Sequence, residues 1–257
     1  MRTKKTMIGV LIGLIIVMAV LAILNKSSVP KYDNKLNMKM DCAFDNVDLF
    51  EVINPAYDIS RELAMGVEVN FSFMESQNGK SRRFSLNVSS MTRREILDEI
   101  VRQNPGYYWK ERDGVINIQP YREDNDKNIS PLDMTIPCFE VHQIPPYFAL
   151  EYLTRLSREH NIPIISDFYE MAIQLGHKLP DSSGKLEHPE NYDPRRLIDV
   201  VIPHKVSIRD CLNAIVLADP PANWEAIKWK GGKTRLSIRS SQSGYSREKN
   251  LDMPNSY

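Results

Sequence analysis

Residues that could bind a metal or carry out catalysis are few in this 257-residue chain, and its five histidines are the first to test. They stand at His142, His160, His177, His188 and His204. No two of them have the His-Glu-x-x-His type of spacing that binds zinc. His177 and His188 could meet near Glu187 or Glu190, but we expect all of these side chains to be structural or solvated. The spacing therefore predicts no metal and no cofactor.

Nucleophiles and carboxylates do not form a catalytic pattern either. The chain has neither a Gly-x-Ser-x-Gly elbow nor a glycine-rich loop of the kind that cradles phosphate. Asp45 with Asp48, and Glu111 with Asp113, are close in sequence, yet nothing ties either pair to a cleft. Cys211 falls on the apolar stripe of a predicted helix, where a thiol is a poor nucleophile. We predict no catalytic residues and no enzymatic activity.

Composition and cysteine count exclude two further classes of protein. Charged residues make up 26% of the chain and the formal net charge is zero, whereas nucleic-acid-binding proteins carry a basic excess. Three scattered cysteines, Cys42, Cys138 and Cys211, are too few for a disulfide scaffold or a zinc cluster. One disulfide is permitted, for example between Cys138 and Cys211, but we expect three buried, small, apolar side chains.

The segment Met7–Leu24 has eighteen residues and no charge, which predicts a transmembrane helix. Such a helix is about 27 Å long, close to the hydrocarbon thickness of a bilayer. The basic residues within positions 1–6 favour a cytoplasmic N-terminus, and residues 25–39 then form a linker on the far side. A cleaved signal peptide is the alternative, although its apolar run is usually about 7 to 15 residues. In both cases the remainder is exported, and we expect an inner-membrane protein with periplasmic domains.

The chain contains an internal repeat, because Thr92–Trp109 matches Ser207–Trp224 without a gap. The identical pairs are Arg94 and Arg209, Leu97 and Leu212, Ile100 and Ile215, Val101 and Val216, Pro105 and Pro220, and Trp109 and Trp224. In each copy a Thr or Ser at the expected helix N-cap precedes an acidic residue by three positions, as in a capping box. Apolar residues at helical spacing then give one buried stripe. We expect the paired tryptophans to be core or hairpin anchors.

Each predicted helix is followed by two strands and a tight turn. The first copy has strands at Tyr107–Lys110 and Val115–Ile118 around Asp113-Gly114, and the second has Asn223–Trp229 and Thr234–Ile238 around Gly231-Gly232. Asp-Gly and Gly-Gly suit such turns because both central residues need positive φ. Weaker similarity upstream, including Cys42–Phe44 against Cys138-Phe139, extends the repeated unit to β-α-β-β-α-β-β.

The sequence therefore predicts the α+β fold class, with an N-terminal transmembrane helix followed by two small β-α-β-β-α-β-β domains. The predicted domains span residues 40–120 and 138–239, with a polar linker at 121–137. Residues 167–196 form an insertion in the second domain, with a short helix at Met171–Leu175, and residues 240–257 form a disordered tail. A long loop on a rigid scaffold is a common place for binding specificity, so the insertion is the first candidate for it.

The run from Phe84 to Pro120 resembles the second half of the short N-terminal domain of secretins and TonB-dependent transducers. That family's pattern is a strand, a helix opened by Thr or Ser, an aromatic strand, and a glycine turn into an isoleucine-rich strand. The matching segments are Phe84–Val88, Thr92–Gln103, Tyr107–Trp109, Asp113-Gly114 and Val115–Ile118. Leu197–Ile238 is similar but less exact. The resemblance implies a small periplasmic module that binds other proteins and carries no catalysis.

The expected function is a non-catalytic, membrane-anchored interaction module of the bacterial cell envelope, in a secretion, pilus or envelope-assembly complex. Its partners would be envelope proteins or further copies of the chain, held where an open sheet edge accepts a strand. The alternative is an exported hydrolase whose site lies between the second domain and its insertion. The sequence does not single out binding residues.

Overall fold

The computed structural model describes residues 31–54, 56–70, 83–122, 129–166, 180–181, 183–186, 196–220, 222–228 and 233–240. The chain divides into two compact units, Met1–Met38 and Lys39–Tyr257, and the first contributes the helix α2 (Lys31–Leu36). Among the described residues, no helix is both long enough and apolar enough to cross a bilayer. The predicted span Met7–Leu24 and nearly all of the predicted tail lie outside those residues.

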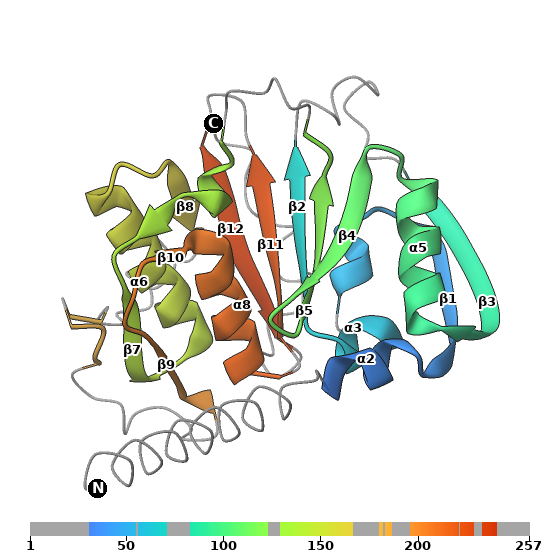
Figure 1. Ribbon diagram of the computed structural model, residues 1–257, viewed down its shortest axis with the longest axis horizontal. Coiled ribbons are helices and arrows are strands. Elements are labelled where there is room, and N and C mark those ends of the chain that lie inside the picture. Colours follow the sequence, from blue (N-terminus) through green and yellow to red (C-terminus); the bar gives the residue numbers. More distant parts are fainter. Residues whose placement is uncertain are drawn as a thin grey trace, which may run out of the picture. The chain divides into compact units, whose positions relative to one another are not determined.

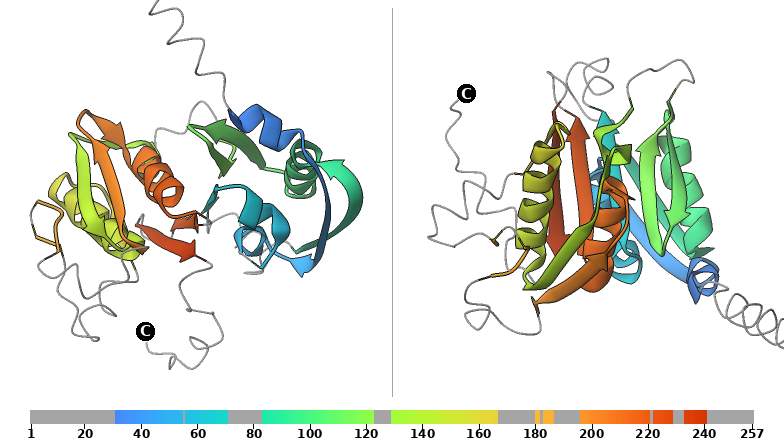
Figure 2. Two further views of the ribbon diagram at one scale, coloured as in Figure 1. Left: turned by 90° about the horizontal axis from the view of Figure 1, so that it is seen from below. Right: turned by 60° about the vertical axis from the view of Figure 1, so that its left-hand side comes forward.

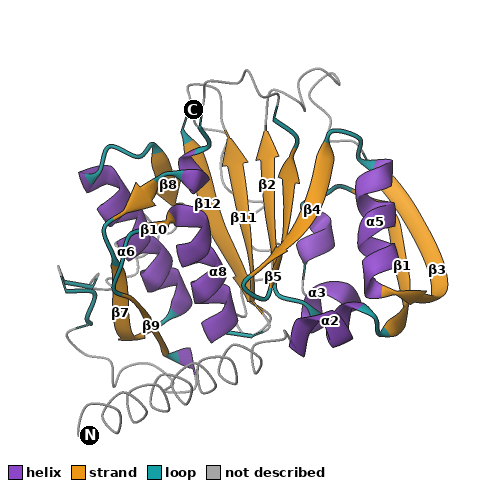
Figure 3. Ribbon diagram, viewed as in Figure 1, coloured by secondary structure: helices purple, strands orange, loops and turns teal. Residues whose placement is uncertain are grey.

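The unit Lys39–Tyr257 has an α+β fold in which one order of elements occurs twice (Figure 1; Figure 3). The first copy consists of β1 (Lys39–Val47), α3 (Asp58–Glu62), β2 (Met65–Asn70), β3 (Phe84–Thr92), α5 (Arg93–Gln103), β4 (Tyr107–Arg112) and β5 (Val115–Pro120). The second copy consists of β7 (Phe139–Ile144), α6 (Pro146–Glu159), β8 (Ile164–Ser166), β9 (Ile198–Ile202), α8 (Ile208–Ala218), β11 (Ala222–Lys228) and β12 (Thr234–Ser240). Short additional elements are η1 (Glu51–Ile53), η2 (Pro131–Asp133), β6 (Thr135–Ile136) and β10 (Val206–Ser207).

Strands from both copies join in one six-stranded sheet with the order β4-β5-β2-β11-β12-β8. The joint between the copies is the parallel pair β2–β11, in which Gly66 lies opposite Trp224. The counterpart strands β4 and β11 run in opposite directions, because β4 is antiparallel to β5, which is parallel to β2. The second set of three strands is thus turned over relative to the first. As a result α6 and α8 cover one face of the sheet, and α3 and α5 cover the other (Figure 2).

Each copy also has a two-stranded antiparallel sheet, β1–β3 or β7–β9, packed against its own helices. The β7–β9 pair, α6, α8 and the central sheet enclose a core that includes the fully buried Phe139, Phe148, Leu212 and Trp224. The stripe predicted on α8 is correct, since Cys211, Leu212, Ile215 and Val216 are all buried. On α5, Ile96, Leu97 and Ile100 are buried, which confirms the matching stripe.

Two matching β-bulges show the repeat where the sequence similarity is weak. Asn46 in β1 and Gln143 in β7 have positive φ values of 49° and 50°, and each lies at a register shift of its strand pair. A bulge leaves a backbone amide outside the ladder, and that amide needs another acceptor. The Asn46 amide donates to Ser85 Oγ at 2.9 Å, and the Gln143 amide donates to Asp199 Oδ1 at 3.1 Å. Ser85 and Asp199 occupy equivalent positions on the partner strands.

The helix caps confirm the local prediction. At the start of α5 the Thr92 hydroxyl accepts from the Glu95 amide at 3.2 Å, and the Glu95 carboxylate accepts from the Thr92 amide at 2.8 Å. At the start of α8 the Ser207 hydroxyl accepts from the Asp210 amide at 3.1 Å. The shorter Asp210 side chain reaches the Ser207 hydroxyl, at 2.7 Å, rather than the Ser207 amide.

The first predicted hairpin is also confirmed. Asp113 and Gly114 have φ values of 52° and 88°, which is the conformation that a two-residue turn of this kind requires. The flanking strands extend by two residues beyond the predicted ends, to Arg112 and Pro120. The turn predicted at residues 231–232 lies outside the described residues.

Part of the predicted linker 121–137 folds with the second copy. Its last nine residues contain η2 and β6, and β6 pairs with β10. The side chains of Leu132 and Ile136 are buried, with exposed fractions of 0% and 1%. These two apolar residues attach the segment to the core, although its composition is polar on average.

A described piece of the insertion 167–196 packs against the second copy. Leu186 belongs to its core cluster, and Lys185 forms a parallel bridge with His142 in β7. Gly184 has a φ of 74°, and a Cβ there would lie 2.4 Å from the Glu140 carbonyl oxygen, so only glycine fits. The short helix predicted at Met171–Leu175 lies outside the described residues.

The first strands predicted at Cys42–Phe44 and Cys138-Phe139 are confirmed as β1 and β7, although the two cysteines are not equivalent in position. The matching bulges align Cys42 in β1 with Phe139 in β7, so Cys138 precedes its strand. A slip of one residue moves a side chain to the other face of a strand. Cys138 is accordingly exposed, against expectation, whereas Cys42 and Cys211 are buried and all three thiols are free. Burial raises the pKa of Cys42 to about 11 and that of Cys211 further, which keeps both thiols protonated.

Candidate functional site

Most residues with potential chemistry make structural contacts. His142 Nε2 lies 2.6 Å from Glu140 Oε1, a hydrogen bond that raises the pKa of His142, and His142 Nδ1 lies 3.4 Å from Asp199 Oδ1. No group of three or more His, Cys, Asp or Glu side chains within the described ranges could hold a metal. The insertion residues considered for a metal site, His177, Glu187, His188 and Glu190, lie outside those ranges.

The two carboxylate pairs have local roles. Asp48 accepts from the Glu51 amide at 3.0 Å, and Asp45 accepts from the Ser85 hydroxyl at 3.3 Å. Glu111 accepts from the Gly114 amide at 2.6 Å and so fastens the β4–β5 turn. Bonds of this kind stabilise turns, and they do not aim two carboxyl groups at a substrate.

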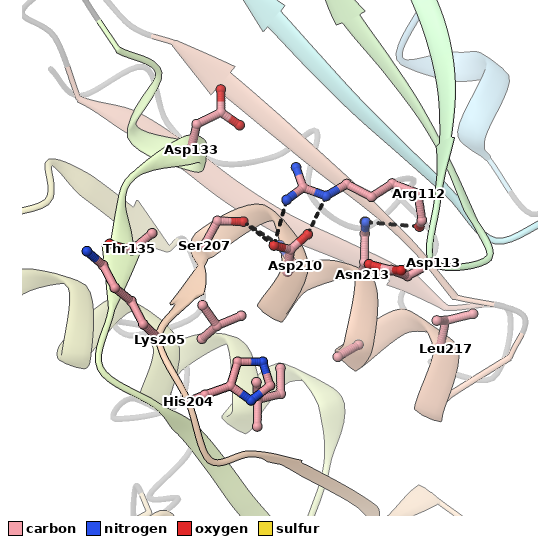
Figure 4. Close-up of a pocket in the computed structure, with 13 residues that line it drawn as sticks. Arg112, Asp113, Asp133, Thr135, His204, Lys205, Ser207, Asp210, Asn213 and Leu217 are labelled. Atoms are coloured by element: carbon pink, nitrogen blue, oxygen red, sulfur yellow. Dashed lines mark hydrogen bonds and ion pairs between the residues drawn. The ribbon is translucent and has the colours of Figure 1, made fainter. Parts of the chain in front are cut away.

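A pocket of about 470 Å³ lies where the β4–β5 turn of the first copy meets the start of α8 (Figure 4). Arg112 holds Asp210 through two contacts, Nε to Oδ1 at 2.6 Å and Nη2 to Oδ2 at 2.8 Å. The Ser207 hydroxyl is the α8 cap and donates to the same carboxylate. His204 and Lys205 also line the pocket, but no hydrogen bond joins His204 to Ser207 among the described residues. Among its described lining residues, the pocket therefore contains an ion pair between the copies, Arg112 with Asp210, and the Ser207 hydroxyl that donates to the same carboxylate.

A second arrangement, of one arginine, one tryptophan and one amide or carboxylate, occurs in both copies at equivalent positions. In the first copy the Trp109 indole donates to Asp98 Oδ1 at 2.7 Å, and the Arg94 guanidinium carbon lies 5.6 Å from the indole centroid. In the second copy the Trp224 indole donates to Asn213 Oδ1 at 2.8 Å. We call the two sets of residues the first and the second Arg–Trp clusters; the second is completed by an arginine of α8.

The second Arg–Trp cluster lies against β2 and is closed to solvent. Its arginine, Arg209, has its guanidinium carbon 5.9 Å from the Trp224 ring centroid, within reach of a cation–π attraction. Arg209 is 1% exposed and Trp224 is 0% exposed. A Cβ on Gly66 would lie 2.0 Å from Trp224 Cε2, so the indole covers the backbone of β2 at that residue. Gly66 is therefore the residue that permits the copies to join.

The charge of Arg209 is neutralised by acidic residues from outside its own helix. Its Nη2 lies 2.6 Å from Glu68 Oε2, and its Nε lies 2.9 Å from Asp133 Oδ1. Arg122 contacts the same two carboxylates at 3.0 and 2.7 Å, and Ser130 donates to Glu68 at 2.7 Å. Burial opposes the charged form of Arg209, but Glu68 and Asp133 outweigh it and raise the pKa. The pair of arginines and the pair of acids thus hold β2, η2 and α8 together.

The first Arg–Trp cluster lies at an edge of the sheet. Its strand, β4, pairs with β5 on one side and has no other strand neighbour within the described part of the chain. Arg94 and Trp109 are half-buried and Asp98 is exposed. An exposed Asp98, a half-buried indole and a strand edge that no described strand pairs with together form a surface that can accept another strand. This β4 edge, with Arg94, Asp98 and Trp109, is the candidate functional site.

Comparison with protein-family models, with curated proteins and with solved structures finds no match for this chain. The interpretation of the β4 edge therefore depends on its own geometry and on the internal repeat. The sequence pointed to Trp109 and Arg94 as repeated residues, but it assigned both tryptophans the same core or anchor role. The signal that could have separated them is Gly66-Val67-Glu68, which supplies glycine and a carboxylate to one cluster only.

Proposed function

We propose that this chain is a non-catalytic, membrane-anchored protein-interaction module of the bacterial cell envelope. Its two β-α-β-β-α-β-β copies resemble the short N-terminal domain of secretins and TonB-dependent transducers, and they stand on the non-cytoplasmic side of the inner membrane. The setting is a secretion, pilus or envelope-assembly complex. The support from the sequence is the charge-free run Met7–Leu24 behind a basic N-terminus, and the repeated cap, stripe and tryptophan.

The observation that carries the proposal is the open β4 edge with its Arg–Trp cluster. Edge strands attract other strands, and proteins usually protect them with charges, bulges or covering loops. Trp and Arg are the residue types enriched where interfaces gain most of their binding energy. In this chain the second Arg–Trp cluster already serves as a strand-docking surface, since it holds β11 and α8 against β2.

The pocket of Figure 4 supports a binding role over a hydrolytic one. Its best candidate nucleophile, Ser207, is occupied as a helix cap, and the nearest carboxylate, Asp210, is held by Arg112. A hydrolase would need a base directed at the nucleophile. In the described part of the pocket the base in hydrogen-bond contact with Ser207 is Asp210, at 2.7 Å, and that carboxylate is held in an ion pair by Arg112.

Site-specific photo-crosslinking in the living bacterium tests the proposal. A photoreactive amino acid replaces the exposed Lys110 on β4 in the full-length chain, and Val201, which is 53% exposed on β9, is replaced as the control. We expect a discrete crosslinked protein from position 110 that is absent from position 201. Deleting residues 167–196 should leave that product unchanged. The absence of any crosslinked protein from β4 would contradict the proposal.

A further inference from the structure

We propose that the pocket of Figure 4, which lies along α8, binds the same surface of a second copy of this chain in a two-fold contact. This inference rests on the proposed function, because it uses two copies anchored in one membrane. It adds self-association through a surface other than the β4 edge. Its support comes from a comparison of α8 with α5, from the charges beside the pocket, and from two glycines in the predicted span.

The outward face of α8 is apolar where that of α5 is charged. In the gap-free match of the two helices, Glu99 and Arg102 of α5 correspond to Ala214 and Leu217 of α8. On α5 these two side chains form an ion pair, with Arg102 Nε 2.6 Å from Glu99 Oε2, and the Arg102 side chain is 72% exposed. On α8 Leu217 is 40% exposed and lines the pocket. The second copy thus has an exposed leucine where the first has a solvated ion pair.

The exposed leucine belongs to a larger apolar surface. Ile202, Val206, Ala214 and Leu217 line the pocket together, and its volume is about 470 Å³. A hollow of this size with apolar lining and a polar rim is typical of a binding site. The same surface carries the hollow and, beside it, a leucine side chain of the kind that fills such a hollow.

Opposite charges stand on the two sides of the pocket. One side is the segment after β9, with His204 and Lys205, and the other is the β4–β5 turn, with Asp113 (Figure 4). Among the described residues, neither Lys205 nor Asp113 makes an ion pair within the chain. If a two-fold axis runs parallel to α8, Lys205 of each copy lies on the side that faces Asp113 of the other. Two pairs of opposite charge then flank the apolar centre, so the surface is complementary to itself.

The predicted span favours a second copy over a different protein as the occupant. It contains Gly9 and Gly13, which are separated by three residues. This spacing lets two transmembrane helices approach closely and is typical of parallel helix dimers. Two copies that are anchored side by side raise each other's effective concentration, so a contact limited to one pocket becomes populated.

Sedimentation equilibrium of the full-length chain in density-matched detergent micelles measures the association. We expect a monomer–dimer equilibrium that Leu217→Arg weakens by about tenfold or more (about 1.4 kcal/mol). Ala214→Glu combined with Leu217→Arg transfers the ion-paired face of α5 to α8, so it should keep the helix folded and weaken association at least as much. Ile129→Arg is the matched control, because Ile129 is 69% exposed and does not line the pocket, and it should leave association unchanged.

A pair of charge changes tests the facing sides of the pocket. Asp113 has a φ of 52°, which asparagine also adopts readily, so Asp113→Asn preserves the β4–β5 turn. Lys205→Glu alone and Asp113→Asn alone should each weaken association by about threefold. Together they should weaken it less than Lys205→Glu alone, because no like charges then face each other. If the loss in the double variant equalled the sum of the two single losses, Lys205 and Asp113 would not face each other in the dimer.

Two further results would overturn the inference. One is a wild-type chain that stays monomeric at every concentration, and the other is association that Leu217→Arg leaves unchanged. In the second case, loss of association through Gly13→Ile would assign the contact to the anchors alone. Neither result involves the β4 edge, so a crosslink from Lys110 to a different protein would leave the proposed function standing. If Lys110 also captures no protein, both fall.

Discussion

The two Arg–Trp clusters place the same side chains in opposite environments. Arg209 and Trp224 are buried beneath β2, whereas Arg94 and Trp109 are half-buried at a sheet edge. Both tryptophans donate an indole hydrogen bond to the same helix position, so the difference does not come from the copies themselves. It comes from the neighbouring strand. One repeat thus places the same residue types in the core where a strand covers them and at a sheet edge where no described strand does, and this edge is the binding surface that we propose.

The comparison also explains why the molecule does not simply form a longer sheet. The buried cluster needs glycine and a carboxylate from β2, and these are Gly66 and Glu68. The open cluster has a carboxylate of its own, Asp98, at the helix position where the buried cluster has the neutral Asn213. Edge-to-edge pairing with an arbitrary strand is discouraged, because a side chain opposite Trp109 would meet the indole.

The largest expected difference concerns the two tryptophans. Trp224→Ala should lower the free energy of unfolding by about 3–5 kcal/mol, because loss of a fully buried aromatic side chain leaves a cavity and leaves Asn213 Oδ1 without its indole donor. Trp109→Ala should lower it by about 1 kcal/mol, since the indole is half-exposed. Urea unfolding of the full-length chain in micelles, followed by far-ultraviolet circular dichroism, measures both. Equal losses would mean that the clusters do not differ as described.

A second difference concerns the two arginines. Arg209→Met should destabilise the protein by about 3 kcal/mol, because Glu68 is left buried with less compensation. Arg94→Met should change stability by less than about 1 kcal/mol, as expected for a charge near the surface. The double variant Arg209→Met with Glu68→Gln should recover part of the loss in the same urea experiment. If the loss in the double variant equalled the sum of the losses measured for Arg209→Met alone and Glu68→Gln alone, Arg209 and Glu68 would not be coupled.

Much of the local structure could be predicted from sequence. The cap at Thr92, the apolar stripes of α5 and α8, and the turn at Asp113-Gly114 each depend on residues within a few positions of one another. Side-chain spacing and backbone preference determine such features directly. The repeat was visible for the same reason, because its strongest match lies within one helix and one strand.

The joint between the copies could not be predicted in this way. Met65 and Asn223, hydrogen-bonded across β2–β11, are 158 positions apart, and no local periodicity records that pairing. The bulges at Asn46 and Gln143 also escaped prediction, and without them Cys138 was aligned one residue out of register. Consequently the sequence identified Arg94 and Trp109 as counterparts of Arg209 and Trp224. It did not predict that the two pairs differ in burial.

A smaller effect concerns the pH dependence of the buried cluster. Burial alone would raise the pKa of Asp133, but Arg209 and Arg122 outweigh it and lower the pKa. A lowered carboxyl pKa stabilises the fold fully above the unfolded value, near 3.9, and the contribution disappears as pH falls through the folded value. Asp133→Asn should therefore cost about 1 kcal/mol at neutral pH and little at the acid end of that window. Urea unfolding from pH 7 downward measures it, with Asp98→Asn in the open cluster expected to change stability by less than about 0.5 kcal/mol at each pH.

A further difference lies at the N-caps of α5 and α8, the helices that carry the two clusters. Thr92→Ala and Ser207→Ala should each cost about 1 kcal/mol, because each removes the acceptor of a first-turn amide.

Substitution of the acidic residue three positions after each cap should affect the two copies differently. Glu95→Ala removes a bond to the Thr92 amide and should cost less than Thr92→Ala. Asp210→Ala also removes the ion pair with Arg112 that links the copies, so its loss should be larger, about 1–2 kcal/mol, and should shrink in 1 M salt. A salt-independent loss at Asp210 would show that the copies are held together by the sheet joint and the Arg209 network alone.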